Sequence, residues 1–246
     1  MFTLLTILTP LTFIMTLTRR EQIRKNTTQE IKEIARKQML ASGAASLSLR
    51  AIAREMGMSA PALYRYFENR DALVTELILD AYNALADAMI TAEAKVARED
   101  YYGRFQTITS AYRNWAKQNP ADFSLIYGTP IPGYHAPRDL TTPAAVRSQQ
   151  ALGLIFGEAW QAGKLTPPTD YTNLPPAIDA VIAELSQQQP QKDVPSVAIT
   201  LTIYTWTRLY GLVWGEFYGH YPPGFADTGE YFEREIAAMA TQLGFS

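Results

Sequence analysis

The sequence predicts an all-α fold, in which a small N-terminal head of three helices is joined by a long helix to a larger C-terminal helical domain. Apolar residues recur at helical spacing along most of the 246-residue chain. The breaks between these stretches are rich in proline and glycine, for example at 129–137. Neither strand-like alternation nor a hairpin turn is found. We divide the chain into an apolar extension (1–18), a head (19–75) and a second domain (76–246).

Composition excludes several classes of function. Hydrophobic residues make up 47% of the chain, which is enough for a sizeable core. Because there is no cysteine, a disulfide framework, an iron–sulfur cluster and a cysteine nucleophile are excluded. The two histidines, His135 and His220, leave little for a metal site, and we expect no metal or cofactor. Residues 19–70 hold 11 of the 22 Lys and Arg residues, as in a small basic module attached to a neutral or acidic one.

The first eighteen residues are apolar but resemble neither a signal peptide nor a membrane span. No Lys or Arg precedes the apolar run, and no cleavage site of small residues follows it. Six threonines and Pro10 interrupt it, and its length is at the short limit for a bilayer. We favour Met15 as the true start of translation. We therefore expect a cytoplasmic protein without a membrane partner, with anchoring by residues 1–18 as the alternative.

Three helices are predicted in the head, followed by the long helix. The first runs from Thr28 to about Ala41, and a basic arm precedes it. The second follows the N-cap residue Ser48 and ends at Gly57, and the third extends from Ala60 to about Phe67. The arm consists of Arg19, Arg20, Arg24 and Lys25; Asn69 caps the long helix; and further helices are predicted at about 103–118, 120–127, 143–162, 175–188, 195–219 and 228–243.

Two short helices separated by a tight turn form the helix-turn-helix pattern. Gly57 permits the positive backbone angle that ends the second helix and redirects the chain. The third helix then presents an N-terminal end with small residues, which fits the major groove of DNA. A plain helical hairpin within a bundle is the alternative.

Residues 47–77, LSLRAIAREMGMSAPALYRYFENRDALVTEL, closely resemble the DNA-binding domain of the TetR-like (tetracycline-repressor-like, TetR/AcrR) transcriptional regulators. The family pattern is R-x-I-A-x-x-x-G, then Ser, then L-Y-x-x-F, then x-N-K-x-x-L. This chain has Arg70 for the usual Lys and Tyr66 for the frequent His. The matching residues are Arg50, Ile52, Ala53, Gly57, Ser59, Leu63, Tyr64, Phe67, Asn69 and Leu73.

The resemblance implies a role for each residue of the head that faces DNA. Arg65 is the candidate for reading a base, because arginine can pair with guanine through two hydrogen bonds; a phosphate contact is the alternative. The basic arm either enters a groove or is a solvated tail. Tyr64, Tyr66 and Arg70 are expected on phosphates, Ser48 at a helix cap near phosphate, and Ser59, Ala60 and Ala62 near base edges.

The C-terminal domain is expected to bind a small effector, as in the family. It holds 23 of the 28 aromatic residues. The segments 126–137 and 206–220 resemble a subgroup whose last domain carries a Trp-His-Gly motif, with Tyr210 in place of the His. Either the aromatic rings surround a pocket for an apolar or aromatic molecule, or they fill the core. The candidate pocket residues are Phe105, Tyr112, Trp115, Phe123, Tyr127, Phe156, Trp160 and Tyr204, with Trp206, Tyr210 and Trp214 nearby.

A homodimer is expected through the last two long helices. Gly211, Gly215 and Gly219 recur every four residues and would form one bare helix face. Close packing within one subunit, or a loop passing over the helix, is the alternative. One short reading helix covers few bases, so a twofold dimer on a pseudo-palindromic operator is favoured.

The sequence therefore predicts a DNA-binding transcriptional regulator, a repressor that a small apolar or aromatic effector releases. An activator is the alternative within the family. A small helical enzyme would need His135 or His220 beside a carboxylate such as Asp139 or Glu216, and no nucleophile with its base is visible. We expect no enzymatic activity.

Overall fold

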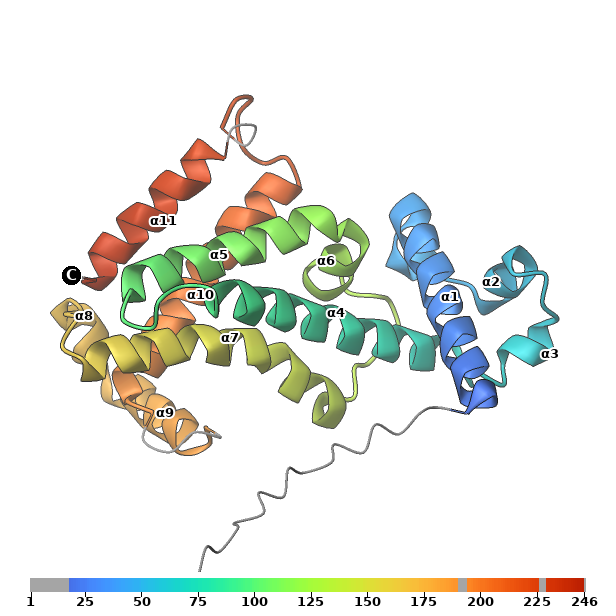
Figure 1. The fold of residues 1–246 in the computed structure, drawn as a ribbon, viewed down its shortest axis with the longest axis horizontal. Helices are drawn as coiled ribbons and strands as arrows, with labels where there is room; N and C mark the ends of the chain where they lie inside the picture. Colours follow the sequence, from blue (N-terminus) through green and yellow to red (C-terminus); the bar gives the residue numbers. More distant parts are fainter. Residues whose placement is uncertain (1–17, 190–193, 226–228, 246) are drawn as a thin grey trace, which may run out of the picture.

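The computed structural model describes residues 18–189, 194–225 and 229–245, and these ranges are helical with no strand, which confirms the all-α prediction (Figure 1). An isolated antiparallel bridge joins Leu165 to Phe245. The prediction for Met15 lies outside the described residues. The elements are α1 (Arg19–Ser42), the 3-10 turn η1 (Ala44–Ser46), α2 (Leu49–Glu55), α3 (Ala60–Leu63), α4 (Arg70–Glu93), α5 (Tyr101–Gln118), α6 (Pro120–Tyr127), α7 (Arg138–Gln161), α8 (Thr169–Thr172), α9 (Pro176–Gln187), α10 (Ser196–Phe217) and α11 (Glu230–Leu243).

The head (α1 to α3) forms one end of the molecule, and α3 lies at its outer tip (Figure 1). Helix α4 begins beside the head and continues into the body formed by α4 to α11. The predicted boundary between residues 75 and 76 falls inside this helix. A shift of α4 along or about its axis therefore moves the head relative to the body.

The prediction of a basic arm before the first helix was wrong, because those residues belong to α1. Helix α1 starts at Arg19, nine residues before the predicted start at Thr28. Thr18 accepts a hydrogen bond from the backbone N–H of Glu21, and the Glu21 carboxylate accepts one from the backbone N–H of Thr18 at 2.8 Å. This capping box satisfies the first free donors of the helix, so the helix extends back to it.

The third helix is shorter than predicted. Helix α3 ends at Leu63, whereas the prediction extended it to about Phe67. Residues 64–66 form turns instead. The backbone N–H groups of Tyr66 and Phe67 both point to the carbonyl of Leu63, at 2.8 and 3.3 Å. This tight turn brings the chain to Asn69, whose side chain caps α4 by accepting from the N–H of Ala72 at 2.8 Å.

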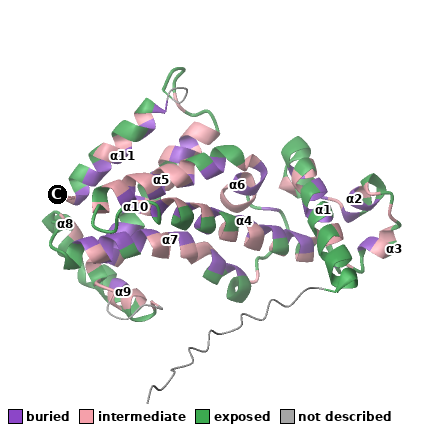
Figure 2. Cartoon of the chain, viewed as in Figure 1, coloured by how far each residue is buried: buried purple, intermediate pink, exposed green. Residues whose placement is uncertain are grey.

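Two hydrophobic cores lie along α4. Leu73, Val74 and Leu77 belong to the head core with Ile52 and Leu63. Farther along α4, Ala81, Leu85 and Met89 belong to the core of the body. Figure 2 shows buried segments where α4, α5, α7 and α10 meet, whereas the outer faces of the head helices are largely exposed. One helix therefore belongs to both cores.

The longer body helices occur where they were predicted, with shifted ends. Helix α7 begins at Arg138 and includes Pro143, five residues before its predicted start, and α10 ends at Phe217 rather than 219. The four-residue α8 was not predicted. Among the described residues, no helix combines the length and apolar character needed to cross a bilayer, and no cluster of three potential metal ligands is found.

Candidate nucleic-acid interface

The tip of the head presents a short helix with small side chains. Gly57 has a φ of +64°, and the N–H of Met58 donates to the carbonyl of Ala53 at 2.8 Å, which closes the turn after α2. Leu63 is fully buried and fixes α3 to the head core. Ser59 is exposed, and its hydroxyl caps no backbone group of the helix. This hydroxyl is therefore available to a ligand outside the head.

Small and polar side chains lie beside Ser59 on this tip. Ala60 and Ala62 are half-buried, so little side-chain bulk covers the start of α3. Tyr64 and Arg65 are exposed, with no ion pair for Arg65 in the described chain. Ser48 caps α2 by accepting from the N–H of Ala51 at 3.4 Å. The structure thus brings the predicted contact residues to one end of the molecule.

Two predicted phosphate contacts also have partners inside the head. The Arg24 guanidinium lies over the Tyr66 ring, 5.3 Å from its centroid, and donates to the carbonyl of Arg65 at 3.4 Å. Arg70 donates to the carbonyls of Ala44 and Ala45, at 3.2 and 3.0 Å. Arg24 therefore supports the turn after α3, and Arg70 fixes the start of α4 to η1.

Arg50 and Arg54 of α2 are additional cations that the sequence reasoning did not place among the contact residues. Both are exposed, and neither forms an ion pair within the described part of the chain. Arg50 follows the Ser48 cap by two positions and is the first residue of the family motif. Its place in the motif and its positive charge were the features of the sequence that could have marked Arg50 as a DNA-contact residue.

Ion pairs join the head to the body. Lys32 of α1 lies 2.9 Å from Asp80 of α4, and Arg36 of α1 donates from Nε to Oδ1 of Asp122 in α6 at 2.8 Å. Burial raises the pKa of Asp122 above its ordinary value, and the neighbouring Arg36 offsets only part of this effect. Thr75 and Tyr134 share a hydrogen bond of 2.9 Å. These polar contacts lie beside apolar ones, because Ala121 and Ile131 of the body are buried in the head core.

Most of the predicted pocket residues belong to the body core or pack against it. Phe105, Tyr112, Phe123 and Phe156 are fully buried and pack against other rings, as in the edge-to-face Tyr112–Trp206 pair with centroids 5.3 Å apart. Burial raises the pKa of Tyr112 and of Tyr127. At the other extreme, Trp160 and Tyr204 are 40% and 42% exposed. These positions fit the alternative in which the rings fill the core.

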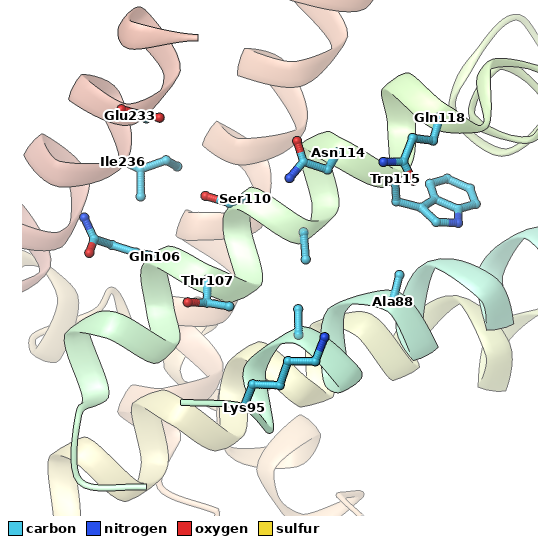
Figure 3. Close-up of a pocket in the computed structure, with 12 residues that line it drawn as sticks. Ala88, Lys95, Gln106, Thr107, Ser110, Asn114, Trp115, Gln118, Glu233 and Ile236 are labelled. Atoms are coloured by element: carbon cyan, nitrogen blue, oxygen red, sulfur yellow. The ribbon is translucent and has the colours of Figure 1, made fainter. Parts of the chain in front are cut away.

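Two of the grooves on the body are considered as sites for a small molecule. One of about 710 Å³ lies between α4, α5 and α11, and Figure 3 shows its mainly polar lining of Lys95, Gln106, Ser110 and Asn114. Trp115 is the predicted pocket residue that contributes to it. The other, of about 520 Å³, lies between α7, α9 and α10. Neither groove is formed by the set of rings that the sequence indicated.

The three glycines do not form one helix face. Gly219 lies beyond the end of α10 with a φ of +70°, so it follows the helix rather than lying on it. A side chain at Gly215 would meet the Tyr221 ring at 2.8 Å, because the loop after α10 folds back over that position. Within the helix, only Gly211 has open space where a Cβ would lie, with no atom within 4 Å. The prediction of a continuous bare face was wrong.

Two residues of the enzyme alternative, Glu216 and His220, have other partners. Arg113 binds the Glu216 carboxylate through two hydrogen bonds of 2.6 Å, and Lys117 adds a third at 3.3 Å. Although burial raises the pKa of Glu216, these two cations lower it below its usual value overall. His220 stacks on the Trp214 ring. Glu216 is thus fixed as a charged partner of α5.

A short exposed helix at the tip of a basic head, joined by a long helix to an all-helical body, defines a helix-turn-helix regulator. Residues 31–77 match the model of the bacterial regulatory proteins of the tetR family, and residues 105–239 match that of the tetracyclin repressor-like C-terminal domain. The chain belongs to the TetR family.

Relatives agree with this assignment over nearly the whole chain. An HTH-type transcriptional regulator of Mycobacterium tuberculosis (strain H37Rv) is 34% identical over 228 residues, which are 92% of this chain and 95% of that protein. A Mycobacterium bovis regulator gives the same values. The crystal structure of the regulatory protein SCO4313 is 37% identical with a TM-score of 0.72, covering 91% of this chain and 100% of that one.

A more distant structure extends the likeness to the fold alone. A tetR-family regulatory protein from Rhodococcus RHA1 is 14% identical with a TM-score of 0.61, covering 89% of this chain and 97% of that one. The protein is therefore a helix-turn-helix transcriptional regulator, and the enzyme alternative has no support from the family.

Proposed function

We propose that the protein is a cytoplasmic repressor whose dimer binds a pseudo-palindromic operator and leaves it when a small effector binds the body. The observation that carries this proposal is the exposed α3 at the outer tip, with the side chains of Ser59 and Arg65 free of partners inside the head. Helix α4 connects that tip to the body without interruption. A ligand that favours one position of α4 therefore alters the spacing between the two reading helices.

The exposed side chains of the tip divide into base readers and phosphate contacts. Arg65 reads a base, while Ser59, Ala60 and Ala62 leave room for α3 to approach the groove floor. Tyr64, Tyr66 and Ser48 contact phosphates, and we add Arg50 to this group because it is exposed and unpaired. Arg70 acts by positioning η1 and α4, and its remaining exposure permits a phosphate contact as well.

The dimer forms through the outer face of α10 together with α11. Tyr204, Thr207 and Gly211 are exposed at spacings of three and four residues, so they share one face of α10. Ala238 of α11 is also exposed, and Arg208 of α10 donates a hydrogen bond to Gln242 of α11, which ties the two helices together. Small and flat side chains favour packing against the same surface of a second copy. We also propose that the protein belongs to the Trp-His-Gly subgroup, because segment 206–220 resembles it.

Selection of bound duplexes from random DNA tests the proposal. The expected result is an inverted repeat whose half-sites are centred about one helical turn apart. The matched variants are Arg65→Ala at the tip and Lys37→Ala, an exposed cation on α1. Arg65→Ala should change the selected sequence, and Lys37→Ala should not. Enrichment of no sequence by the wild-type protein would contradict the proposal.

A further inference from the structure

The groove between α7, α9 and α10 has the lining of a site for a small apolar molecule. Leu154 of α7, Leu185 of α9, and Ile199 and Ile203 of α10 contribute apolar side chains from three helices. Its volume of about 520 Å³ falls within the usual range for ligand pockets. The groove is therefore suited to an elongated molecule that lies along α7.

Close packing of α7 on α10 forms the bottom of this groove. A side chain at Gly153 would meet the Thr202 hydroxyl at 2.9 Å, and one at Gly157 would meet Pro195 at 3.6 Å. Helix α9 contacts α10 and buries only Ile182 fully. The space between α7 and α9 is consequently left open above the contact of α7 with α10.

The polar groups of the groove are neutral amides and hydroxyls. Gln149, Gln150 and Gln188 lie along its edges, and Gln150 donates to Gln189 across from α7 at 3.5 Å. The single ionic side chain in the lining is Glu158, and each of its carboxylate oxygens already accepts from an arginine. A charged ligand would lose its hydration without gaining a counter-ion, whereas an uncharged ligand could exchange hydrogen bonds with the amides.

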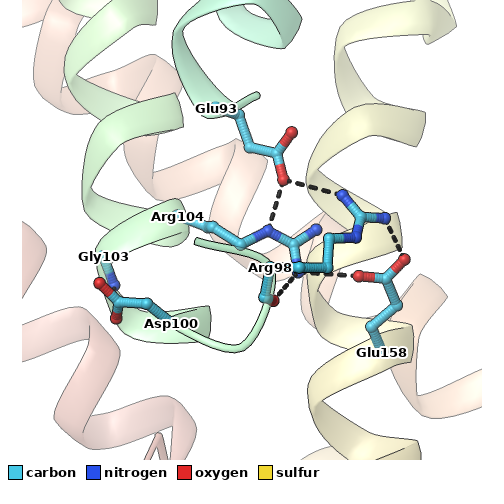
Figure 4. A network of polar contacts seen from close by, with 6 residues as sticks. All are labelled: Glu93, Arg98, Asp100, Gly103, Arg104 and Glu158. Carbon is cyan, nitrogen blue, oxygen red and sulfur yellow. Dashed lines mark hydrogen bonds and ion pairs between the residues drawn. The ribbon is translucent and has the colours of Figure 1, made fainter. Parts of the chain in front are cut away.

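Glu158 links the groove to the end of α4 (Figure 4). Its carboxylate binds Arg98 and Arg104, the latter at 2.8 Å, and both arginines also bind Glu93, the last residue of α4. Arg104 is fully buried and donates further to the carbonyl of Arg98 at 2.9 Å. A shift of α7 at the groove is thus transmitted by ion pairs to the helix that enters the head.

We propose that this groove binds an uncharged, elongated and largely apolar small molecule with a hydrogen-bonding end, and that Glu158, Arg98 and Arg104 couple its occupancy to α4. The inference rests on the proposed function, because it assigns the effector site and the effector class of that regulator. It favours this groove over the more open, polar groove between α4, α5 and α11.

The binding site is tested on the full chain with Nile red, an uncharged apolar fluorophore. Leu154→Trp fills the groove from α7, and Leu140→Trp is the matched control, since Leu140 is exposed on the same helix outside the groove. We expect Leu154→Trp to raise the Kd at least tenfold and Leu140→Trp to leave it within twofold. Unchanged binding by Leu154→Trp, or equal loss with Ser110→Trp in the other groove, would overturn the assignment.

Sedimentation of the same variants separates a ligand site from a subunit contact. We expect Leu154→Trp to keep the molecular mass of the wild-type protein. A lower mass for this variant alone would show that the groove holds a second copy, which would overturn the proposal.

The coupling is tested by the effect of Nile red on the affinity for a selected duplex. Saturating probe should weaken wild-type DNA binding at least fivefold, and by linkage the duplex should weaken probe binding equally. Arg98→Gln removes a half-exposed member of the network and should keep probe affinity within twofold while abolishing the effect on DNA. Glu93→Gln, at the α4 end of the network and outside the groove lining, serves as a second variant with the same expectation.

The outcomes distinguish the two proposals. Probe binding in the groove without any DNA binding would contradict the proposed function and leave the site intact. DNA binding that the probe weakens equally in the wild type and in both network variants would overturn the coupling through Glu158.

Discussion

The head and the body use their side chains in opposite ways. In the head, a modest apolar core around Ile52 and Leu63 supports a surface that carries exposed cations such as Arg50, Arg54 and Arg65. In the body, the buried aromatic rings pack against one another, as Phe105 does against Phe156 in a tilted pair with centroids 5.9 Å apart. The head is therefore a rigid support for external contacts, and the body has a densely packed interior with ligand-sized space at its helix–helix seams.

The joint between them differs from both. Ion pairs among Lys32, Arg36, Asp80 and Asp122 lie there beside Ala121 and Ile131, which extend the head core into the body. Lys32 and Asp122 are only 9% and 10% exposed, so removing the partner of either leaves a largely buried charge unpaired and destabilises the joint. The joint therefore combines the apolar packing of the head with the ion pairs that the body supplies.

The largest expected effects on folding free energy come from truncating a fully buried side chain in either core. Leu63→Ala removes a fully buried side chain of the head and should cost about 2–5 kcal/mol of folding free energy, and Phe156→Ala in the body about 3–5 kcal/mol. Denaturant unfolding with circular dichroism measures both. Leu63→Ala should abolish DNA binding while the protein remains dimeric, and loss of the dimer in this variant would show that the two cores are not independent.

The second prediction concerns the joint. Arg36→Met leaves the largely buried Asp122 carboxylate without its closest cation and should cost about 2 kcal/mol, less than for a fully buried pair, because Arg36 is 22% exposed. Asp122→Asn should change stability at pH 7 by less than about 1 kcal/mol, because the amide needs no counter-ion. Chemical unfolding of both single variants and of the double variant gives the coupling between them.

The pH dependence of stability sharpens this prediction. Burial raises the folded-state pKa of Asp122, so the folded protein holds a proton that the unfolded chain releases. The stability from this group is fully present below about pH 4 and is lost as the pH rises through the folded-state pKa. Compared with Asp122→Asn, the wild-type protein should lose stability over that window. A relative gain instead would mean that Arg36 outweighs burial.

The third prediction divides base reading from phosphate binding. Arg65→Ala should cost about 1–3 kcal/mol of binding free energy at one or two base positions and relax the preference there. Competition of single-base variants of the operator measures it. Equal weakening on all sequences would assign Arg65 to a phosphate.

The smallest expected effect is that of Tyr64→Phe. Loss of one hydroxyl contact to a phosphate should weaken binding by about 1 kcal/mol on every sequence. Affinity should also fall steeply with added salt in both proteins, since the cations of the head displace counter-ions. A change of sequence preference in Tyr64→Phe would show that Tyr64 contacts a base.

The sequence predicted the head better than the body because the head is a local structure. Ser48, Gly57 and Asn69 act on neighbours within a few residues, so their spacing alone fixes the helix-turn-helix. The early start of α1 was also readable, from the T-x-x-E pattern of Thr18 and Glu21, but was missed. The roles of Arg24 and Arg70 depend on carbonyls 41 and at least 25 residues away, which no local pattern reveals.

The body depends on contacts between distant segments. The spacing of Gly211, Gly215 and Gly219 suggested a bare face, yet the return of Tyr221 over Gly215 and the helix end before Gly219 are set by tertiary structure. An aromatic composition likewise fits both a core and a pocket, and packing decides between them. The grooves are lined by glutamines, alanines and aliphatic residues that have no distinctive pattern in sequence.

The central claim, that the tip around α3 lies against DNA, is tested most directly by protection of single cysteines from alkylation. The chain has no native cysteine, so Ser59→Cys at the tip and Leu140→Cys on the body each provide one reactive thiol. With a selected duplex present, the account predicts at least tenfold slower alkylation at position 59 and no change at position 140. Equal rates with and without DNA at position 59, under conditions where the duplex is bound, would contradict it.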